Sequence, residues 1–329
     1  MDQIRCKYMG HKNACQHLAD GHSEFCFWHN AQVIKNTPDI KTRLENLFNE
    51  GHSLEGFELH NAQLSGVNLA GANLIGARLL HADLSKANLS RANLADVRFF
   101  QANLSGASLF KANLENANLN EANLENANLL GVRLENARLE HTYWGKILLQ
   151  EKLAIAAQKA GKKIEAQQLY GEAEEVARYL TNESEKRRQY DVGGHFYQLE
   201  RVMRRMQTRP FSGAWLWSKL VDILCGYGEN ASRVISFSLS VIITSAMFYF
   251  FLGVRDGDGM LIFNAQESIE HNLFGFLECL YFSVITFTTV GYGDILPIGF
   301  ARFIAASEAF IGAFSISLFV VVFMRKMTQ

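Results

Sequence analysis

Two long apolar stretches lie in the last third of the chain, which is otherwise largely polar. Residues 234–254 contain no charged side chain, and residues 303–324 contain one, Glu308. A helix of about 20 apolar residues is long enough to cross the hydrocarbon core of a membrane. Both stretches therefore predict membrane-spanning helices. Between them, residues 274–288 are apolar but too short to span and then connect onward, which predicts a re-entrant helix.

A second pattern covers residues 54–139, where leucine recurs at every fifth position and Phe99 is the one exception. The residue two positions before each leucine is usually alanine, with valine at 67, 97 and 132. A period of five fits neither an amphipathic helix nor an alternating strand. The pattern resembles the pentapeptide-repeat family. That resemblance implies a right-handed quadrilateral β-helix with four pentapeptides per coil and an interior of leucine and alanine. Such a solenoid needs covered ends, and Trp144, with Tyr143, is placed to begin the C-terminal cover.

The remaining segments favour helices. Residues 37–50 carry Thr37 as a candidate N-cap, Pro38 at the first helical position and Gly51 after the end. Residues 146–206 predict a helical hairpin with a break at Gly161, and its basic last part is typical of a segment shortly before a membrane span. Residues 212–228 are amphipathic and rich in Trp, which predicts a helix lying on the inner membrane surface. An ordinary buried helix is the alternative.

Charge and composition exclude several functions. The chain has 329 residues and a net charge of −1, so no overall attraction to nucleic acid is expected. Residues 57–140 carry eight acids and seven bases, too balanced for an acidic imitation of DNA, so a rigid spacer or an assembly surface is the better interpretation. No signal peptide is expected. The sequence shows no nucleophile–base pair, phosphate loop or open metal site, and we expect no enzyme.

Three cysteines and a histidine near the N-terminus predict a structural zinc site. Cys6, Cys15, Cys26 and His29 form a complete tetrahedral Cys3His set, and their spacing is similar to that of small plant Cys3His modules. A segment of about thirty residues has little apolar material for a core, so a metal would supply its folding energy. Three reduced, buried cysteines beside a surface histidine are the alternative. Three other histidines are alternative ligands: His11, His17 and His22.

The most informative stretch, residues 288–294, reads Thr-Thr-Val-Gly-Tyr-Gly-Asp. Potassium-selective filters replace the hydration shell of the ion with rings of backbone carbonyls. Gly291 and Gly293 can adopt the positive φ angles that turn alternate carbonyls inward, while Val290 and Tyr292 pack outward. Thr289 adds a hydroxyl as the innermost ligand. The predicted ion-binding residues are thus 289–293, and the permeant ion is K⁺.

The filter and its flanking spans resemble the pore domain of two-transmembrane bacterial potassium channels over residues 212–326. The resemblance implies a homotetramer, because one filter strand cannot encircle an ion. Thr288, Asp294, Tyr281, Phe282 and Glu308 are the expected filter supports. We expect Tyr281 to donate to Asp294, whereas Phe282 has no donor, and Ile285 replaces a glutamate that some relatives place behind the filter. Gly312 matches the inner-helix hinge, with close helix packing as the alternative.

Charge asymmetry sets the expected orientation. Basic residues lie at the inner ends of both spans (Arg233, Arg325 and Lys326). Arg255 follows the first span, and the loop after it, residues 256–271, holds four acids and no Lys or Arg (Asp256, Asp258, Glu267 and Glu270). The positive-inside rule then places both termini in the cytoplasm. We expect a multi-pass protein of the bacterial plasma (inner) membrane that contacts the lipid bilayer and itself, but not nucleic acid.

Together these expectations divide the chain into a zinc module (1–30), a helical linker (31–53), a β-helix (54–144), a cytoplasmic helical hairpin (145–210) and a pore domain (211–329). The pore domain contains spans at 234–254 and 303–324, with the pore helix and filter at 273–294. The leading hypothesis is a potassium-selective channel regulated by its N-terminal cytoplasmic domain. The alternative is a membrane-anchored scaffold or interaction protein with a weakly selective or vestigial pore. An intact filter favours the channel.

Overall fold

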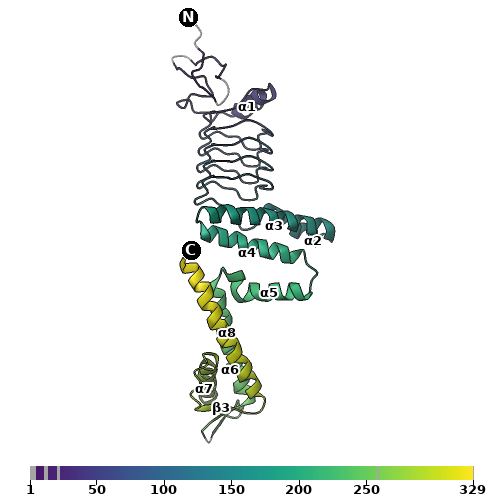
Figure 1. Cartoon of the computed structure of the whole chain (residues 1–329), viewed down its shortest axis with the longest axis vertical. Coiled ribbons are helices and arrows are strands. Elements are labelled where there is room, and N and C mark those ends of the chain that lie inside the picture. The colour runs from purple at the N-terminus through teal and green to yellow at the C-terminus, as the bar shows by residue number, and fades with distance from the viewer. Residues whose placement is uncertain (1–4, 11–13, 21–22, 258, 329) are drawn as a thin grey trace. The chain divides into compact units, whose positions relative to one another are not determined.

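A computed structural model of the chain describes residues 5–10, 14–20, 23–257 and 259–328 (Figure 1). These residues form two compact units, residues 1–207 and residues 208–329. The first unit contains the five-residue repeats, and the second contains both long apolar stretches. Each unit is described by itself.

The second unit is mainly helical. Helix α5 (Gly213–Cys225) is followed by a short 3-10 turn, η1 (Gly226–Gly228), and then by the two long apolar helices α6 (Ala231–Leu252) and α8 (Ala301–Thr328). Helix α7 (Ile269–Phe287) lies between them in the chain and packs against both. Both α6 and α8 are long and apolar enough to cross a membrane, in agreement with the sequence-based prediction.

A small sheet, which the sequence analysis did not predict, joins the helices of this unit. Its strands β1 (Val254–Asp256), β2 (Gly259–Leu261) and β3 (Ile295–Pro297) pair antiparallel in the order β2-β1-β3. Gly253 ends α6 with a φ of 87° and leads into β1, so the first span is shorter at this end than the predicted 234–254. Asp258 of the acidic loop lies outside the described residues.

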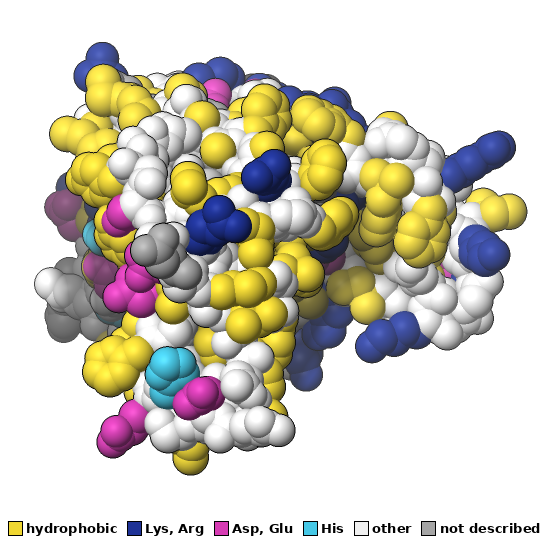
Figure 2. Space-filling model, turned by 90° about the horizontal axis from the view of Figure 1, so that it is seen from below, with side chains coloured by type: hydrophobic (Ala, Val, Ile, Leu, Met, Phe, Trp, Pro, Cys, Tyr) yellow, Lys and Arg dark blue, Asp and Glu magenta, His cyan; other side chains and the backbone are white. Residues whose placement is uncertain are grey.

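Both apolar helices leave large side chains on the surface of the chain. Phe251, Phe303, Phe310 and Val321 are each more than half exposed. Hydrophobic side chains cover much of the face seen in Figure 2. An apolar surface of this kind is stable against lipid tails or another chain rather than against water.

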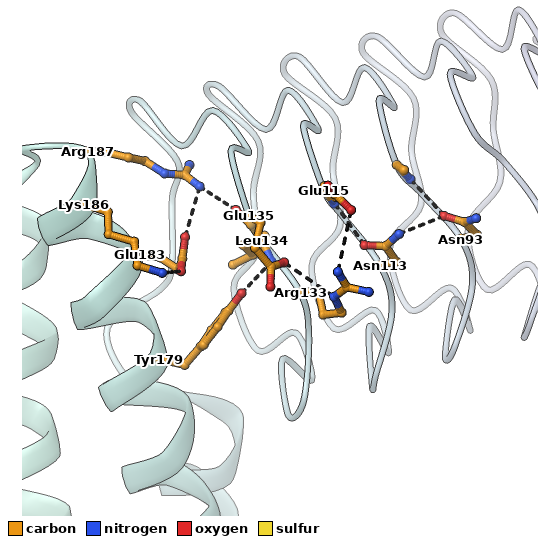
Figure 3. Close-up of polar contacts among 11 residues, drawn as sticks. Asn93, Asn113, Glu115, Arg133, Leu134, Glu135, Tyr179, Glu183, Lys186 and Arg187 are labelled. Atoms are coloured by element: carbon orange, nitrogen blue, oxygen red, sulfur yellow. Dashed lines mark hydrogen bonds and ion pairs between the residues drawn. The ribbon is translucent and has the colours of Figure 1, made fainter.

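In the first unit, the repeats form a solenoid of twenty-residue coils. Parallel bridges join each coil to the next, as in Asn93↔Asn113 and Asn103↔Asn123, so each coil holds the predicted four pentapeptides. The repeated leucine and the preceding alanine are buried along the whole solenoid, as predicted. On the surface, asparagines form a ladder in which Asn113 Nδ2 donates to Asn93 Oδ1 over 3.1 Å (Figure 3). Stacked amides of this type satisfy polar groups that face the same direction on successive coils.

The N-terminal end of the solenoid is covered by helix α1 (Ile40–Asn49) and by the segment around Trp28. Ile40 and Leu44 of α1 are completely buried in the solenoid core. Trp28 stacks on Phe57 of the first coil at 5.1 Å between ring centroids. Helix α1 begins at Ile40 with Asp39 as its N-cap, so the predictions of Thr37 as the N-cap and Pro38 as the first helical residue were wrong. Thr37 and Pro38 lie just before the helix.

Three helices follow the repeats: α2 (Leu149–Lys159), α3 (Lys163–Lys186) and α4 (Tyr190–Met206). Gly161 separates α2 from α3 with a φ of 75°, as the sequence predicted. Helix α3 packs against both of the others, so the expected hairpin has a third member. Trp144 packs edge-on against Phe196 of α4, which places it in the C-terminal cover, while Tyr143 remains about half exposed.

Polar side chains of α3 and of Arg187, the residue directly after it, satisfy the backbone of the last complete coil (Figure 3). The amide of Leu134 donates to Tyr179 Oη over 2.7 Å, and Arg187 Nη2 donates to the carbonyl of Leu134 over 2.5 Å. Glu183 in turn accepts from Lys186 over 2.7 Å. An exposed strand edge invites pairing with another chain. These bonds close the solenoid at its C-terminal end.

Replacing Tyr179 with Phe should leave the Leu134 amide without this acceptor. We expect the first unit to lose about 1–2 kcal/mol of unfolding free energy, the cost of an unpaired buried donor. Thermal or denaturant unfolding followed by circular dichroism measures the loss. Replacing the exposed Tyr143 with Phe is the matched control, and an equal effect of both changes would contradict the role of Tyr179.

Candidate functional site

The first candidate site is the cluster of Cys6, Cys15, Cys26 and His29, whose ligand atoms all lie within 4.8 Å of one another. Cys15 Sγ is 3.9 Å from Cys26 Sγ, and His29 Nδ1 is 3.2 Å from Cys26 Sγ and 3.6 Å from Cys6 Sγ. Zn–S bonds of about 2.3 Å in a tetrahedron place sulfurs about 3.8 Å apart. The four side chains therefore have the spacing of a closed tetrahedral metal site.

The surroundings of this cluster determine the charge of its side chains and the orientation of its histidine. Burial raises the pKa of the Cys15 thiol to about 12 and also raises that of Cys26. A bound dication would instead stabilise the thiolates. Burial lowers the pKa of His29, which keeps its imidazole neutral as a ligand must be. With Nδ1 facing the sulfurs, His29 Nε2 is 2.9 Å from the carbonyl of Glu55 and donates to it. This second bond fixes the ring, as is common for metal-binding histidines.

The same contacts attach the cluster to the solenoid. Glu55 belongs to the first coil, and the neighbouring amide of Glu58 donates to the carbonyl of Trp28 over 2.8 Å. Of the alternative ligands, His17 lies outside the cluster with its ring 5.2 Å from that of His52. His11 and His22 lie outside the described residues.

The second candidate site is the loop between α7 and β3. Thr289, Gly291 and Gly293 have φ angles of 59°, 57° and 82°, while Val290 and Tyr292 between them do not have positive φ. This alternation turns successive carbonyls to the same side of the chain. Positive φ was expected at the two glycines but not at Thr289, where a Cβ makes it unfavourable.

Hydrogen bonds to the end of α7 hold the start of this loop. Ser268 caps the N-terminus of α7 by accepting from the amide of His271, and the helix runs to Phe287. The amide of Val290 then donates to the carbonyl of Ile285 over 3.0 Å, and Thr288 Oγ1 donates to Val284 O over 2.7 Å. The loop therefore starts from a fixed point on the helix.

Hydrogen bonds from Tyr281 and Ile295 hold the end of the loop at Asp294. Tyr281 Oη donates to Asp294 Oδ2 over 2.8 Å, the bond expected from the sequence, and Asp294 Oδ1 accepts from the amide of Ile295 over 3.0 Å. Ile295 opens strand β3, which pairs with β1 directly after α6. Phe282 and Ile285 are buried in the apolar core of this unit and make no polar contact with the loop through their side chains.

Glu308, seven residues after the start of α8, contacts both α6 and α7. Its carboxylate group contacts Tyr249 of α6 and Ser283 of α7, each over 2.5 Å. Glu308 is 2% exposed, and both partners are completely buried. The predicted support role thus has a specific geometry, with three helices meeting at one carboxyl group.

Gly312, the predicted hinge, lies within the continuous helix α8. A Cβ built on it would overlap the carbonyl oxygen of Phe287 at the end of α7. The absence of a side chain is therefore explained by close packing of α8 on the helix that carries the loop. The hinge role stays a prediction.

The entry to α6 is held by an ion pair. Arg233 Nη1 donates to both the carbonyl and Oδ1 of Asp222 in α5, each over 2.7 Å. Gly226, Tyr227 and Gly228 make the turn between the two helices with three successive positive φ angles. The amphipathic helix is thereby attached to the start of the first apolar helix.

Comparison with known proteins agrees with this geometry. Residues 236–329 match the family model described as "Ion channel". The chain carries an ion channel domain. Residues 62–101 and 102–140 match the model described as "Pentapeptide repeats (8 copies)".

A curated relative of part of the chain is Protein LctB from Bacillus caldotenax. It is 33% identical over 79 residues, which cover 24% of this chain and 58% of that protein. This chain therefore spans little more than half of its relative.

Solved structures similar to this chain include pentapeptide repeat proteins from the Arabidopsis thaliana thylakoid lumen and from the cyanobacterium Cyanothece 51142. The first is 23% identical, covering 32% of this chain and 71% of the other, with a TM-score of 0.23. The second is 45% identical, covering 25% and 63%, with a TM-score of 0.13. The assignment of the repeats rests on the family model and on the twenty-residue coils rather than on these superpositions.

Sequence reasoning missed three features of the ion channel domain: the partners of Glu308, the sheet around the loop, and the pair formed by Arg233 and Asp222. A signal for the first was present, since Ser283 and Tyr249 are polar side chains inside apolar segments, where a partner is expected. The sheet strands are three residues each, too short to give a periodic pattern.

Proposed function

We propose that the protein is a potassium-selective channel in which four copies of the chain surround one pore. The observation that carries the proposal is the alternation of φ in residues 289–293 within the sequence Thr-Val-Gly-Tyr-Gly. It presents a row of carbonyls on one side of the loop, and four such rows around an axis would form the rings that replace the hydration shell of K⁺.

Four-fold assembly also accounts for the exposed loop. Val290 and Tyr292 are 52% and 72% exposed in the single chain, and irregular backbone at membrane depth is stable only when it is buried in protein or lines water. Neighbouring copies would supply that burial. We propose that the protein lies in a bacterial inner membrane, and the charge asymmetry around the spans supports an orientation with both termini in the cytoplasm.

The cytoplasmic part is proposed to hold a structural Zn²⁺ through Cys6, Cys15, Cys26 and His29, and to regulate opening through the helices that lead to α6. Zinc is favoured because the cluster has four nitrogen and sulfur ligands at tetrahedral spacing and no open position. We propose no enzymatic activity.

Flux of K⁺ and Na⁺ into liposomes that contain the purified protein tests the channel. We expect K⁺ to enter much faster than Na⁺. Gly291→Ala should abolish the preference, because left-handed backbone costs about 1–2 kcal/mol per chain once a Cβ is present. Gly213→Ala is the control, since that glycine has no positive φ and no atom near a new Cβ. Equal entry of both ions would favour the alternative, a membrane-anchored scaffold with a weakly selective or vestigial pore.

A further inference from the structure

The carboxyl group of Glu308 joins the three helices of the ion channel domain that determine the position of the pore loop. Tyr249 of α6 donates its hydroxyl to Oε2, and Ser283 of α7 contacts Oε1. Ser283 lies six positions before Thr289, on the helix whose end holds the loop. Anything that changes the contacts of Glu308 therefore acts directly on that helix.

A count of hydrogens identifies the protonation state that fits this arrangement. Ser283 Oγ lies 2.5 Å from Glu308 Oε1 and 2.8 Å from the carbonyl of Ile242 in α6. A hydroxyl has one hydrogen to donate. If Glu308 is ionised, both neighbours of Ser283 are acceptors and one short contact has no hydrogen. If Glu308 carries a proton on Oε1, it donates to Ser283, Ser283 donates to Ile242, and every contact has its hydrogen.

The surroundings of the carboxyl group agree with the neutral form. In the part of the chain that the structure describes, no Lys or Arg side chain forms an ion pair with Glu308. Helix α6 presents Tyr249 and Ser245 to it, and α7 presents Ser283, with the buried thiol of Cys279 in the same core as Tyr249. The two carboxylates of α7, Glu270 and Glu278, are both exposed. On its other side Glu308 borders a mainly apolar groove between α6 and α8, where a charge would be poorly solvated.

We propose that Glu308 is a protonated carboxylic acid that positions the pore helix, and that its deprotonation releases this helix. The proposal deepens the channel function proposed above, on which its consequence for ion flow rests. Glu308 is a positioning residue, because it hydrogen-bonds to Tyr249 and Ser283 rather than to residues 289–293, and it acts through Ser283 and α7.

Infrared spectroscopy of the full chain in liposomes tests the protonation state without reference to ion flow. A buried protonated carboxyl group gives a separate carbonyl stretch, which we expect in the wild type at neutral pH and which should disappear at high pH. Glu308→Gln should remove this band. Glu267→Gln, which removes an exposed carboxylate of the loop before α7, should leave it unchanged. Absence of the band from the wild type at neutral pH, or its persistence in Glu308→Gln, would overturn the proposal.

Flux as a function of pH tests the positioning role. Because the hydrogen bond from Glu308 to Ser283 needs the proton of the carboxyl group, K⁺ flux in the wild type should fall as the pH rises. Glutamine can donate to Ser283 and accept from Tyr249 without a titrating proton, so Glu308→Gln should retain flux and lose this pH dependence. Glu308→Ala should lower flux about tenfold, as expected when buried partners are left unpaired. The same fall with pH in Glu308→Gln and in the wild type would contradict the role.

The two experiments separate this inference from the channel proposal. If the wild type shows the infrared band but carries K⁺ and Na⁺ equally, the channel proposal fails and the protonated state of Glu308 stands. If flux is selective but the band is absent, the channel proposal stands and the inference fails.

Discussion

Removal of the proposed Zn²⁺ from the Cys3His cluster is expected to unfold the N-terminal module and to destabilise the solenoid that the module covers. The four ligands come from a segment with few other buried side chains, and the segment covers the first coil through Trp28 and His29. Structural zinc contributes apparent binding free energies of about 10–16 kcal/mol in zinc-finger peptides. Even a fraction of this value exceeds the cost of most single substitutions.

A strong chelator should therefore lower the melting temperature of the full chain, and Cys26→Ser should reproduce the effect without a chelator. Metal analysis of the purified protein is expected to give one zinc per chain, and none in Cys26→Ser. Cys225→Ser is the matched control, because Cys225 is equally buried but lies in α5, outside the cluster. A wild-type protein that contains no zinc and melts at the same temperature with and without chelator would rule out the metal site.

Gly312→Ala is expected to disrupt the packing of α8 on α7, the helix that precedes the proposed filter. The new Cβ would overlap the Phe287 carbonyl oxygen, with the Phe287 carbonyl carbon and Cα also close. These are backbone atoms at the end of α7, so they cannot move aside as a flexible side chain can. Overpacking of this kind costs about 1–3 kcal/mol per site. Four chains around one pore would each incur that cost.

Size-exclusion chromatography of the detergent-solubilised protein measures the result of Gly312→Ala. We expect the oligomer to dissociate or to elute as a broad, unstable species, whereas Gly213→Ala should behave like the wild type. A stable oligomer with altered opening would instead indicate that Gly312 serves as a hinge and that the neighbouring backbone can adjust.

The solenoid could be predicted from the sequence in detail, because each repeat contacts only its neighbours. The leucine at every fifth position and the alanine before it carry the resemblance to the pentapeptide-repeat family, and that resemblance implied both the coil and the buried interior that the structure has. The residues that cover the two ends of the solenoid were harder to predict. Trp144 was recognised as part of the C-terminal cover, but the role of Tyr179 depends on a contact across 45 residues that no local pattern reveals.

In the loop between α7 and β3, too, some features could be predicted from the sequence and others could not. The positive φ of Gly291 and Gly293 could be predicted from the residue type, because few other residues tolerate it. Thr289 adopts a similar angle only because the surrounding chain imposes it, so residue type gave no signal. The bond from Tyr281 to Asp294 was predictable from the resemblance, whereas the partners of Glu308 come from two other helices and required coordinates.

The twenty-residue coil has a consequence for how the N-terminal module can be positioned. Adjacent strands lie about 4.8 Å apart, so inserting or deleting one full coil would shift the Cys3His cluster by that distance along the solenoid axis without turning it. Inserting or deleting a single pentapeptide would instead turn the cluster by a quarter of a revolution and shift it by about a quarter of that distance. Duplication in units of twenty residues therefore changes only the position of the module along the solenoid axis, whereas duplication in units of five also changes the direction that the module faces.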